Sequence, residues 1–197
     1  YYTPSGRCIQ KPYNEGEEEY QAEIFKRYTS GELLSADSIA VNDSLKYLTK
    51  VKHRTVYGGG GIIPDLFVPM DTNVNYLYFN RLIAKNVIGD WLVNYIDVNR
   101  KSLKANYSTF EKFNKNFVVT DAMIAGIVKA GEKAGVKKDD KLLISILPSM
   151  KLQIKALIAR DLWNMNEMYQ IMNEENDILK RGWEALKDGT YEKILNE

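Results

Sequence analysis

The sequence predicts a mixed α+β fold, with a strand-and-turn part first and a mostly helical part after it. Residues 1–72 are rich in glycine and proline and carry short runs of strand-forming residues. Residues 73–197 contain few glycines and prolines, and their apolar residues recur at helical spacing. We therefore expect one part in residues 1–72 and a helical domain in residues 73–197.

A tight turn is predicted at the start of the chain. Thr3-Pro4-Ser5-Gly6 places proline at the first central position of a turn and glycine where a positive φ can be required. The two tyrosines before the turn and Ile9 after it favour extended backbone. The segment therefore predicts two short strands joined by this turn.

A helix and a hairpin are predicted in the middle of the first part. Glu17–Tyr28 begins with three glutamates, which suit a helix N-terminus, and it carries apolar side chains at helical offsets. These side chains are Tyr20, Ile24, Phe25 and Tyr28. Leu45–Thr49 and Thr55–Tyr57 are strand-like and flank a polar stretch at residues 50–54, which predicts a hairpin.

Four consecutive glycines, Gly58 to Gly61, follow the predicted hairpin and lead through Pro64 to the apolar run Leu66-Phe67-Val68. The apolar run predicts a short buried strand. A phosphate-binding loop would instead open a helix and usually carry a lysine. We therefore expect the glycines to serve positive φ angles or a close approach of two backbones.

The second part carries a series of amphipathic helical segments. Ser108-Thr109-Phe110-Glu111 fits a capping box for a short helix through Phe113, and Thr120-Asp121 can cap the next helix, which closes at Gly135. The other predicted segments are residues 74–85, 88–105, 149–163 and 177–186, with a last turn at 191–195. Their apolar faces are formed by Leu77, Tyr78, Leu82, Ile83, Trp91, Leu92, Tyr95, Ile96, Val98, Leu103, Met123, Ile124, Ile127, Val128, Ile154, Leu157, Ile158, Leu162, Ile178, Leu179, Trp183 and Leu186.

The three tryptophans, Trp91, Trp163 and Trp183, stand at helical positions, and we expect them in the core. An exposed tryptophan would instead be a candidate anchor for a partner.

Two segments of the first part resemble a known enzyme family. Tyr2-Thr3-Pro4-Ser5-Gly6-Arg7-Cys8-Ile9-Gln10 and Gly61-Ile62-Ile63-Pro64-Asp65 are similar to segments of the C-terminal processing, or tail-specific, serine peptidases. The longer sequences at residues 55–61 and 67–72 resemble those of the envelope peptidases of Bacteroides-like bacteria. Two departures are a cysteine at position 8, where the family usually has serine, and an insertion at residues 11–54 that compact members lack.

The resemblance implies that residues 1–72 end a ClpP/crotonase-like peptidase core. In this family the Ser nucleophile and the Lys general base come before the first motif, and a substrate-binding PDZ-type domain comes earlier still. We therefore expect the chain to be a C-terminal fragment of a larger serine endopeptidase that acts on polypeptides. The fragment alone is expected to be inactive, and the resemblance places the parent enzyme in the periplasm or cell envelope.

No residue of this chain is expected to be catalytic, to bind a cofactor or to bind a metal. His53 is the only histidine and lies in a polar turn, where a solvated side chain is expected. Cys8 has no base nearby in the sequence, and it is expected to be a small strand residue. One histidine and one cysteine far apart give no metal-ligand spacing.

Three acidic clusters lack the ligand pattern of a calcium loop. Glu17–Glu19 and the cluster at 174–177 suit helix starts, and Asp139-Asp140 suits a turn before Leu142.

The composition gives no reason to expect a nucleic-acid or membrane partner. The chain has 27 basic and 26 acidic residues, so its formal charge is +1 and it has no global field for polyanions. Lys50, Lys52 and Arg54 form a basic turn beside tyrosines, for which a solvated surface is the expected role. No apolar run is expected to be long enough to span a bilayer.

Self-association and two further classes of function stay open. Strand edges and apolar surface left uncovered in the first part invite pairing with another copy. A non-catalytic helical interaction module, in which the helices beyond residue 72 bind a partner or a second copy, is the main alternative to a peptidase fragment. A binding protein with a ligand pocket between its two parts is a third reading.

Overall fold

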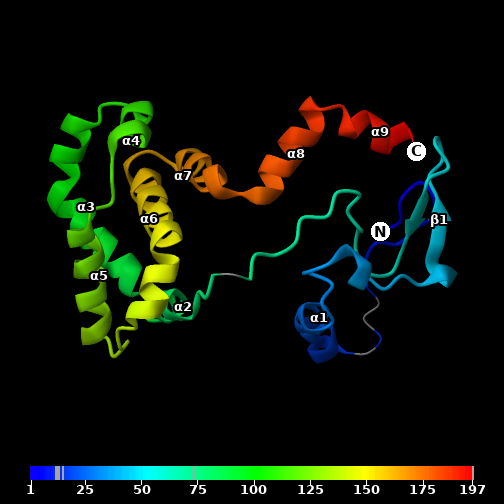
Figure 1. Cartoon of the computed structure of the whole chain (residues 1–197), viewed down its shortest axis with the longest axis horizontal. Helices are drawn as coiled ribbons and strands as arrows, with labels where there is room; N and C mark the ends of the chain where they lie inside the picture. The colour runs from blue at the N-terminus through cyan, green and yellow to red at the C-terminus, as the bar shows by residue number, and fades with distance from the viewer. Residues whose placement is uncertain (12–13, 15, 73, 197) are drawn as a thin grey trace. The chain divides into compact units, whose positions relative to one another are not determined.

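The structure is a computed structural model that describes residues 1–11, 14, 16–72 and 74–196 (Figure 1). It has a mixed and mostly helical fold, as the sequence predicts. The described residues form two compact units. Unit 1 comprises Tyr1–Asp71 and Asp177–Glu197, and unit 2 comprises Thr72–Asn176. The division of the chain into domains at residues 72 and 73 stays a prediction, and each unit is described by itself.

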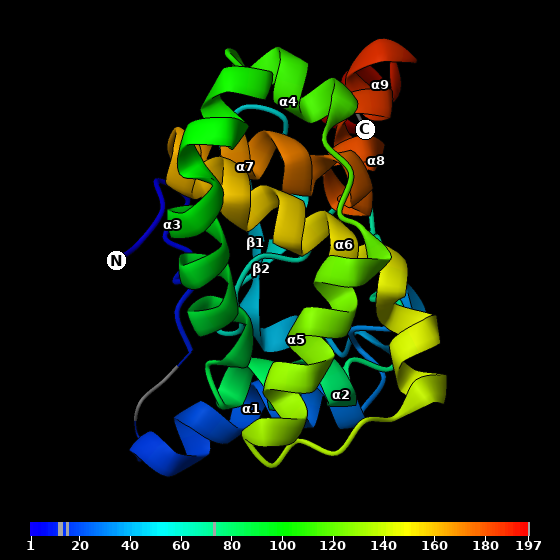
Figure 2. The ribbon, with the colours of Figure 1, turned by 90° about the vertical axis from the view of Figure 1, so that its left-hand side faces the viewer.

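Unit 2 is a bundle of helices. Its elements are α2 (Leu77–Ala84), α3 (Val87–Asn106), α4 (Phe110–Asn116), α5 (Asp121–Lys133), α6 (Asp140–Leu162), α7 (Met165–Met172) and the 3-10 turn η3 (Asn173–Glu175). The central helix is α6, which packs against α2, α3 and α7, while α3 also packs against α2 and α5 (Figure 2).

A continuous apolar core fills unit 2. Its largest fully buried side chains are Tyr78, Phe113, Leu82, Ile88, Ile127, Ile146, Met150, Ile154, Ile158 and Ile171. Most of the apolar faces predicted for this unit are confirmed. Leu77, Ile83 and Val98 were predicted on those faces but are 48%, 49% and 85% exposed. In α3 the buried residue Ile96 lies two positions before Val98, and two positions turn a helix by about 200°, away from the core.

Two of the three tryptophans support this core, as predicted. Trp91 packs with its ring parallel to Tyr95 at 5.1 Å between centroids, and a side chain at Gly126 would come within 2.8 Å of its indole nitrogen. Trp163 lies 5.3 Å from the Phe113 ring, centroid to centroid. The core prediction is wrong for the third tryptophan, Trp183 of unit 1, which is 59% exposed.

Side-chain caps fix the starts of α4, α5, α6 and α7 in unit 2. The Thr120 hydroxyl accepts a hydrogen bond from the backbone N–H of Met123, as predicted. At α4 the cap is Thr109, one residue later than the predicted capping box, and its hydroxyl accepts from the backbone N–H of Lys112. Hydrogen bonds from the backbone of Glu111 and from the side chain of Thr109 lower the pKa of the Glu111 carboxyl.

The start predicted for α6 is wrong, because this helix begins at Asp140 and runs through Pro148. Proline usually ends or kinks a helix, since it lacks the N–H and its ring clashes with the preceding turn. Here the fully buried Ile146 and Met150 hold the segments on both sides of the proline in the core. Figure 2 shows α6 changing direction partway along its length. A further helix, α7, was not predicted; it has only two turns, and its N-cap is Asn164.

By length and composition, α6 can cross a bilayer. Its most apolar 18-residue window has a mean hydropathy of 1.6, and 33% of that window is buried. Core helices of soluble proteins meet the same criterion, so the finding is weak evidence for a membrane. The expectation that no apolar run is long enough to span a bilayer is nevertheless wrong. The segments before and after Pro148 form one continuous helix, which the proline made hard to predict.

Unit 1 contains short elements joined by long connections. They are α1 (Glu17–Thr29), the 3-10 turns η1 (Ala36–Ser38) and η2 (Asp43–Leu45), β1 (Lys46–Leu48), β2 (Thr55–Tyr57), α8 (Asp177–Lys187) and α9 (Thr190–Asn196). The inserted helix, the hairpin and the helix α8 confirm the predictions, while the last turn predicted at residues 191–195 is the short helix α9. β1 and β2 are antiparallel, with Tyr47 opposite Val56, and form the one sheet in the described part of the chain.

Predicted strands of unit 1 are wrong in two places. The two short strands predicted around the first turn are reduced to an isolated bridge between Tyr2 and Cys8. The apolar run at residues 66–68 has no strand structure, and between Gly61 and Thr72 the described backbone forms neither helix nor strand. A strand needs a neighbour for its backbone groups. This segment instead contacts the rest of unit 1 through the N–H of Met70, which donates to the carbonyl oxygen of Leu33 at 2.9 Å, and through the ion pair of Asp65 with Arg54.

Apolar side chains of unit 1 remain mostly uncovered. Among the described residues of this unit, Ala185 is the one buried apolar residue. Phe25 and Tyr28, on the predicted apolar face of α1, are 69% and 46% exposed. Other large apolar side chains left exposed in this unit are Tyr1, Tyr2, Leu34, Val41, Leu48, Val51, Ile62, Ile63, Met70, Ile178, Leu179, Trp183, Leu186, Tyr191 and Leu195.

Candidate functional site

The two motifs of the first part lie against each other in unit 1, although about fifty residues separate them in the sequence. The backbone N–H of Gly59 donates to the carbonyl oxygen of Cys8, and that of Gly61 donates to the carbonyl oxygen of Ile9, each at 2.8 Å. The Arg7 guanidinium donates to the carbonyl oxygen of Tyr57 at 3.4 Å. The glycine run therefore continues β2 alongside the first segment of the chain.

The first motif is a closed turn, as predicted. The Thr3 N–H donates to the carbonyl oxygen of Arg7 at 2.8 Å, and the Gly6 N–H donates back to the carbonyl oxygen of Thr3 at 2.9 Å. Gly6 has a φ of 83°, which glycine adopts without the strain that a side chain would cause. Tyr2 and Cys8 form an antiparallel bridge across this turn. The turn thereby directs residues 7–9 toward the glycine run.

The glycine run is explained by close approach and by positive φ, which confirms the prediction. A Cβ on Gly58 would lie 2.9 Å from the carbonyl oxygen of Cys8, nearer than real Cβ atoms come. Gly59 and Gly61 have φ angles of 81° and 97°. Gly60 has open space around it. Three of the four glycines are thus needed for the contact between the motifs.

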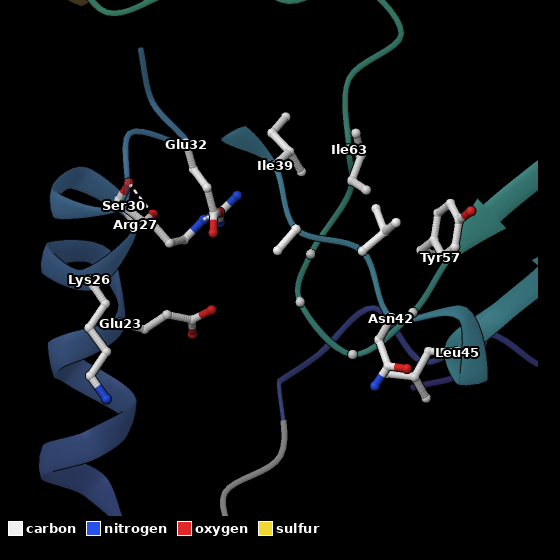
Figure 3. A pocket seen from close by; sticks show the side chains of 16 residues that line it. Glu23, Lys26, Arg27, Ser30, Glu32, Ile39, Asn42, Leu45, Tyr57 and Ile63 are labelled. Atoms are coloured by element: carbon white, nitrogen blue, oxygen red, sulfur yellow. Dashed lines mark hydrogen bonds and ion pairs between the residues drawn. The ribbon is translucent and has the colours of Figure 1, made fainter. Parts of the chain in front are cut away.

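A cavity of about 420 Å³ lies beside this contact (Figure 3). One wall is the last part of α1, with Lys26 and Arg27, and the residue after it, Ser30; another is the connection at residues 39–42. The glycine run and Tyr57 line the cavity as well. Sequence reasoning missed this cavity, because its walls come from separate segments and no motif marks them.

The charged groups of the cavity have ion-pair partners, of which Glu32 lines the cavity itself and Glu19 lies outside it. Arg27 Nε pairs with Glu32 Oε2 at 3.0 Å, and Lys26 pairs with Glu19. The Ser30 hydroxyl donates to the carbonyl oxygen of Arg27 at 3.1 Å. Neither His53 nor Cys8 lines the cavity. The lining is therefore part polar and part apolar, and it holds no nucleophile paired with a base.

His53, Cys8 and the basic turn lie outside the cavity, in surroundings that fit a structural role. His53 is exposed in the turn between β1 and β2, with a φ of 53°. The Cys8 thiol lies 3.7 Å from the carbonyl oxygen of Gln10. In the basic turn, Arg54 pairs with Asp65, and Lys52 donates to the Asn196 side chain at 3.0 Å.

The acidic clusters lie mostly at helix starts. Glu17–Glu19 form the first turn of α1, as predicted, and Glu174 and Glu175 lie in η3. The Asp139 carboxylate accepts from the backbone N–H of Leu142 and so caps α6, where the sequence predicted a turn. In the part of the chain that the structure describes, no three His, Cys, Asp or Glu side chains are grouped to hold a metal ion.

Comparison with known protein families gives a match in unit 2. Residues 78–164 match a family of unknown function, DUF8443, over less than half of the chain. No curated protein and no solved structure matches. The matched residues span α2 to α6 and exclude both motifs and the cavity beside them.

Proposed function

We propose that this chain is the C-terminal part of a serine endopeptidase of the C-terminal processing type, located in the periplasm or cell envelope. The Ser nucleophile, the Lys general base and a PDZ-type domain for the polypeptide substrate then belong to a region that precedes Tyr1. The described chain contributes the closing segments of a ClpP/crotonase-like core and a helical domain. Alone it hydrolyses nothing.

The observation that carries this proposal is the contact between the two motifs. Residues 7–9 and the glycine run belong to the segments whose amino-acid sequence resembles the peptidases. Backbone hydrogen bonds join these two segments. Two segments that close the same core need such a contact, and glycine is required where the backbones meet most closely. The inserted residues 11–54 leave and return at this point without separating the motifs.

The exposed apolar side chains of unit 1 also support the proposal. A stable domain of this size normally buries a core of its own. Unit 1 instead leaves side chains such as Ile62 and Leu48 66% and 52% exposed. A larger peptidase core, supplied by the region before Tyr1, would cover them and would pair the backbone around residues 66–68.

Within the proposed enzyme, the chemistry belongs to residues outside this chain. A lysine acts as a general base for serine when burial keeps its amine neutral, and the activated hydroxyl then attacks the peptide carbonyl. The role of the present chain is to fix the shape of the core in which those groups lie.

The test is to express the chain with and without the region that precedes it and to follow hydrolysis of an unfolded protein. The longer protein should cleave the substrate, and an alanine in place of its nucleophilic serine should abolish cleavage. Comparable activity from the 197-residue chain alone would end this proposal.

A glycine pair tests whether the motif contact matters to that activity. Gly58→Ala places a methyl group 2.9 Å from a backbone oxygen, whereas Gly60→Ala meets open space. In the longer protein, Gly58→Ala should reduce peptidase activity by about tenfold or more, since overpacking costs roughly 1–3 kcal/mol. Gly60→Ala should retain most of the activity. Equal activity of the two variants would separate the contact from catalysis.

A second candidate is a non-catalytic helical interaction module of the cell envelope. Unit 2 favours it, because its core is complete within residues 72–176 and holds the match to a family of unknown function. The open reading frame before Tyr1 distinguishes the two candidates. If that region encodes no Ser and Lys in the peptidase arrangement, the interaction module becomes the better assignment.

A further inference from the structure

An open apolar groove runs between α5 and the first half of α6 in unit 2. Six apolar side chains line a space of about 640 Å³: Ile124, Ala125 and Val128 from α5, and Leu143, Ile144 and Leu147 from α6. Ile124 and Val128 are each 6% exposed and form the floor. Ile144 is 72% exposed and stands at the rim.

We propose that this groove is a self-association surface whose occupant is a second copy of this chain. The groove and the protruding Ile144 belong to the same face. Two copies related by a two-fold axis therefore exchange this side chain, each isoleucine entering the groove of the other copy. Such an interface closes as a dimer, because the same patch acts on both sides.

The charges at the rim favour a second copy over other occupants. Lys129 and Glu132 lie one turn apart on α5, both are exposed, and neither forms an ion pair with another described residue. A two-fold axis between them brings Lys129 of one copy to Glu132 of the other, and the pair forms twice. This charge pattern is complementary to itself.

The other two charged groups at the groove already have partners. Asp121 pairs with Lys151 at 2.7 Å, and Lys138 pairs with Asp140 at 2.6 Å. An anionic lipid surface would meet the carboxylates of Asp121 and Glu132 as well as the lysines. The balanced rim therefore suits a protein surface of the same composition better than a membrane.

This interface differs from the self-association expected at the strand edges of unit 1. All of its residues belong to unit 2, whereas the hairpin and the motif contact belong to unit 1. The proposed dimer does not depend on the proposed peptidase activity.

The test measures the mass of the purified 197-residue chain by sedimentation over a range of concentrations. Ile144→Lys should weaken dimerisation at least about tenfold, because it places a charge in an apolar groove. Val98→Lys on α3 is the matched control, since Val98 is also exposed and apolar, and it should dimerise as the wild type does. Circular dichroism should show that both variants keep the wild-type helix content.

Charge reversal provides a sharper readout. Lys129→Glu and Glu132→Lys should each weaken the dimer, and the double variant should recover wild-type affinity because both pairs form again in reversed order. Mixing the two single variants should give a heterodimer. Additive losses in the double variant would overturn the proposal, as would a dimer unaffected by Ile144→Lys. A monomer that binds phosphatidylglycerol vesicles through Ile144 would assign the groove to lipid instead.

Discussion

Ile158 in unit 2 and Ile62 in unit 1 are the same kind of side chain in opposite surroundings. Ile158 is fully buried in α6, whereas Ile62 is 66% exposed just after the glycine run. The contrast extends to the whole of each unit. Unit 2 contains the whole apolar core cluster, while Ala185 is the one buried apolar residue among the described residues of unit 1. Burial of apolar surface is the main force that stabilises a fold, so the two units depend on different interactions.

Unit 1 depends mainly on backbone hydrogen bonds and a few ion pairs. The turn at Thr3–Arg7, the hairpin and the motif contact are all backbone interactions. A typical hydrogen bond contributes only about 0.5–1.5 kcal/mol net, because water competes for the same groups. Exposed ion pairs such as Arg27–Glu32 usually contribute less than about 1 kcal/mol. The comparison therefore predicts that unit 2 carries most of the stability of this chain.

The largest effect should come from truncating the core of unit 2. Ile158→Ala should lower the free energy of unfolding by about 2–5 kcal/mol, because it removes buried methyl groups and leaves a cavity. Ile62→Ala should change it by less than about 0.5 kcal/mol. Urea unfolding followed by far-UV circular dichroism measures both. Similar losses for the two variants would mean that Ile62 also lies in a stabilising core, and the contrast between the two units would be wrong.

Loss of a helix cap should have a smaller effect, and it should again differ between the units. Thr120→Ala removes the hydroxyl that accepts from the Met123 N–H, and it should cost about 1 kcal/mol. Ser35 caps the short turn η1 of unit 1 in a similar way, accepting from the Asp37 N–H at 3.3 Å. Ser35→Ala should leave the urea midpoint of the helical transition unchanged. A shift as large as that of Thr120→Ala would show that the two units unfold together.

The smallest effect at neutral pH is expected for Tyr78→Phe. The Tyr78 side chain is fully buried, and its hydroxyl has no hydrogen-bond partner among the described residues. Removing an unpaired buried hydroxyl should raise the free energy of unfolding by about 1 kcal/mol or leave it unchanged. Tyr169→Phe, at an exposed position, is the matched control and should be neutral. A loss of about 1 kcal/mol or more in Tyr78→Phe would show that the hydroxyl has a stabilising partner.

The same tyrosine should make unit 2 sensitive to alkali. Burial, together with the negative charges of Glu132 and Asp140, raises the pKa of Tyr78 above its usual value. The unfolded chain then releases this proton at lower pH than the folded chain does. The contribution of Tyr78 to stability is full below pH about 10 and declines as the pH rises toward its folded pKa. Between about pH 9 and pH 11, the free energy of unfolding should fall less steeply with pH in Tyr78→Phe than in the wild type. An identical slope would contradict the assignment of this pH dependence to Tyr78.

Much of the local structure could be predicted because the signals lie within a few residues. The turn at Thr3–Gly6, the cap at Thr120 and the hairpin around residues 50–54 each depend on side chains close to the backbone groups that they serve. The helices of unit 2 follow from the spacing of apolar residues. Errors arose where tertiary contacts overrode a local rule, as at Pro148, where buried neighbours on both sides keep the helix continuous.

The candidate site could be predicted only in part. The glycines were expected to serve close approach or positive φ, and Gly58, Gly59 and Gly61 do so. Their partners, the carbonyl oxygens of Cys8 and Ile9, could not be inferred, since about fifty intervening residues give no spacing rule. The cavity walls at Lys26 and Arg27 were missed for the same reason. The exposure of Trp183 could not be predicted either. Trp183 lies on an amphipathic helix, but the pattern of apolar residues does not say whether another surface covers the tryptophan.

The sequence by itself determined most of the helices, the first turn and the hairpin, because backbone preferences, caps and periodicity act over short distances. Only the tertiary structure decided which apolar faces are covered. In unit 2 the helices meet and bury their stripes in a common core. In unit 1 equally apolar side chains remain open to solvent. Burial depends on two surfaces meeting, and a linear pattern describes only one of them.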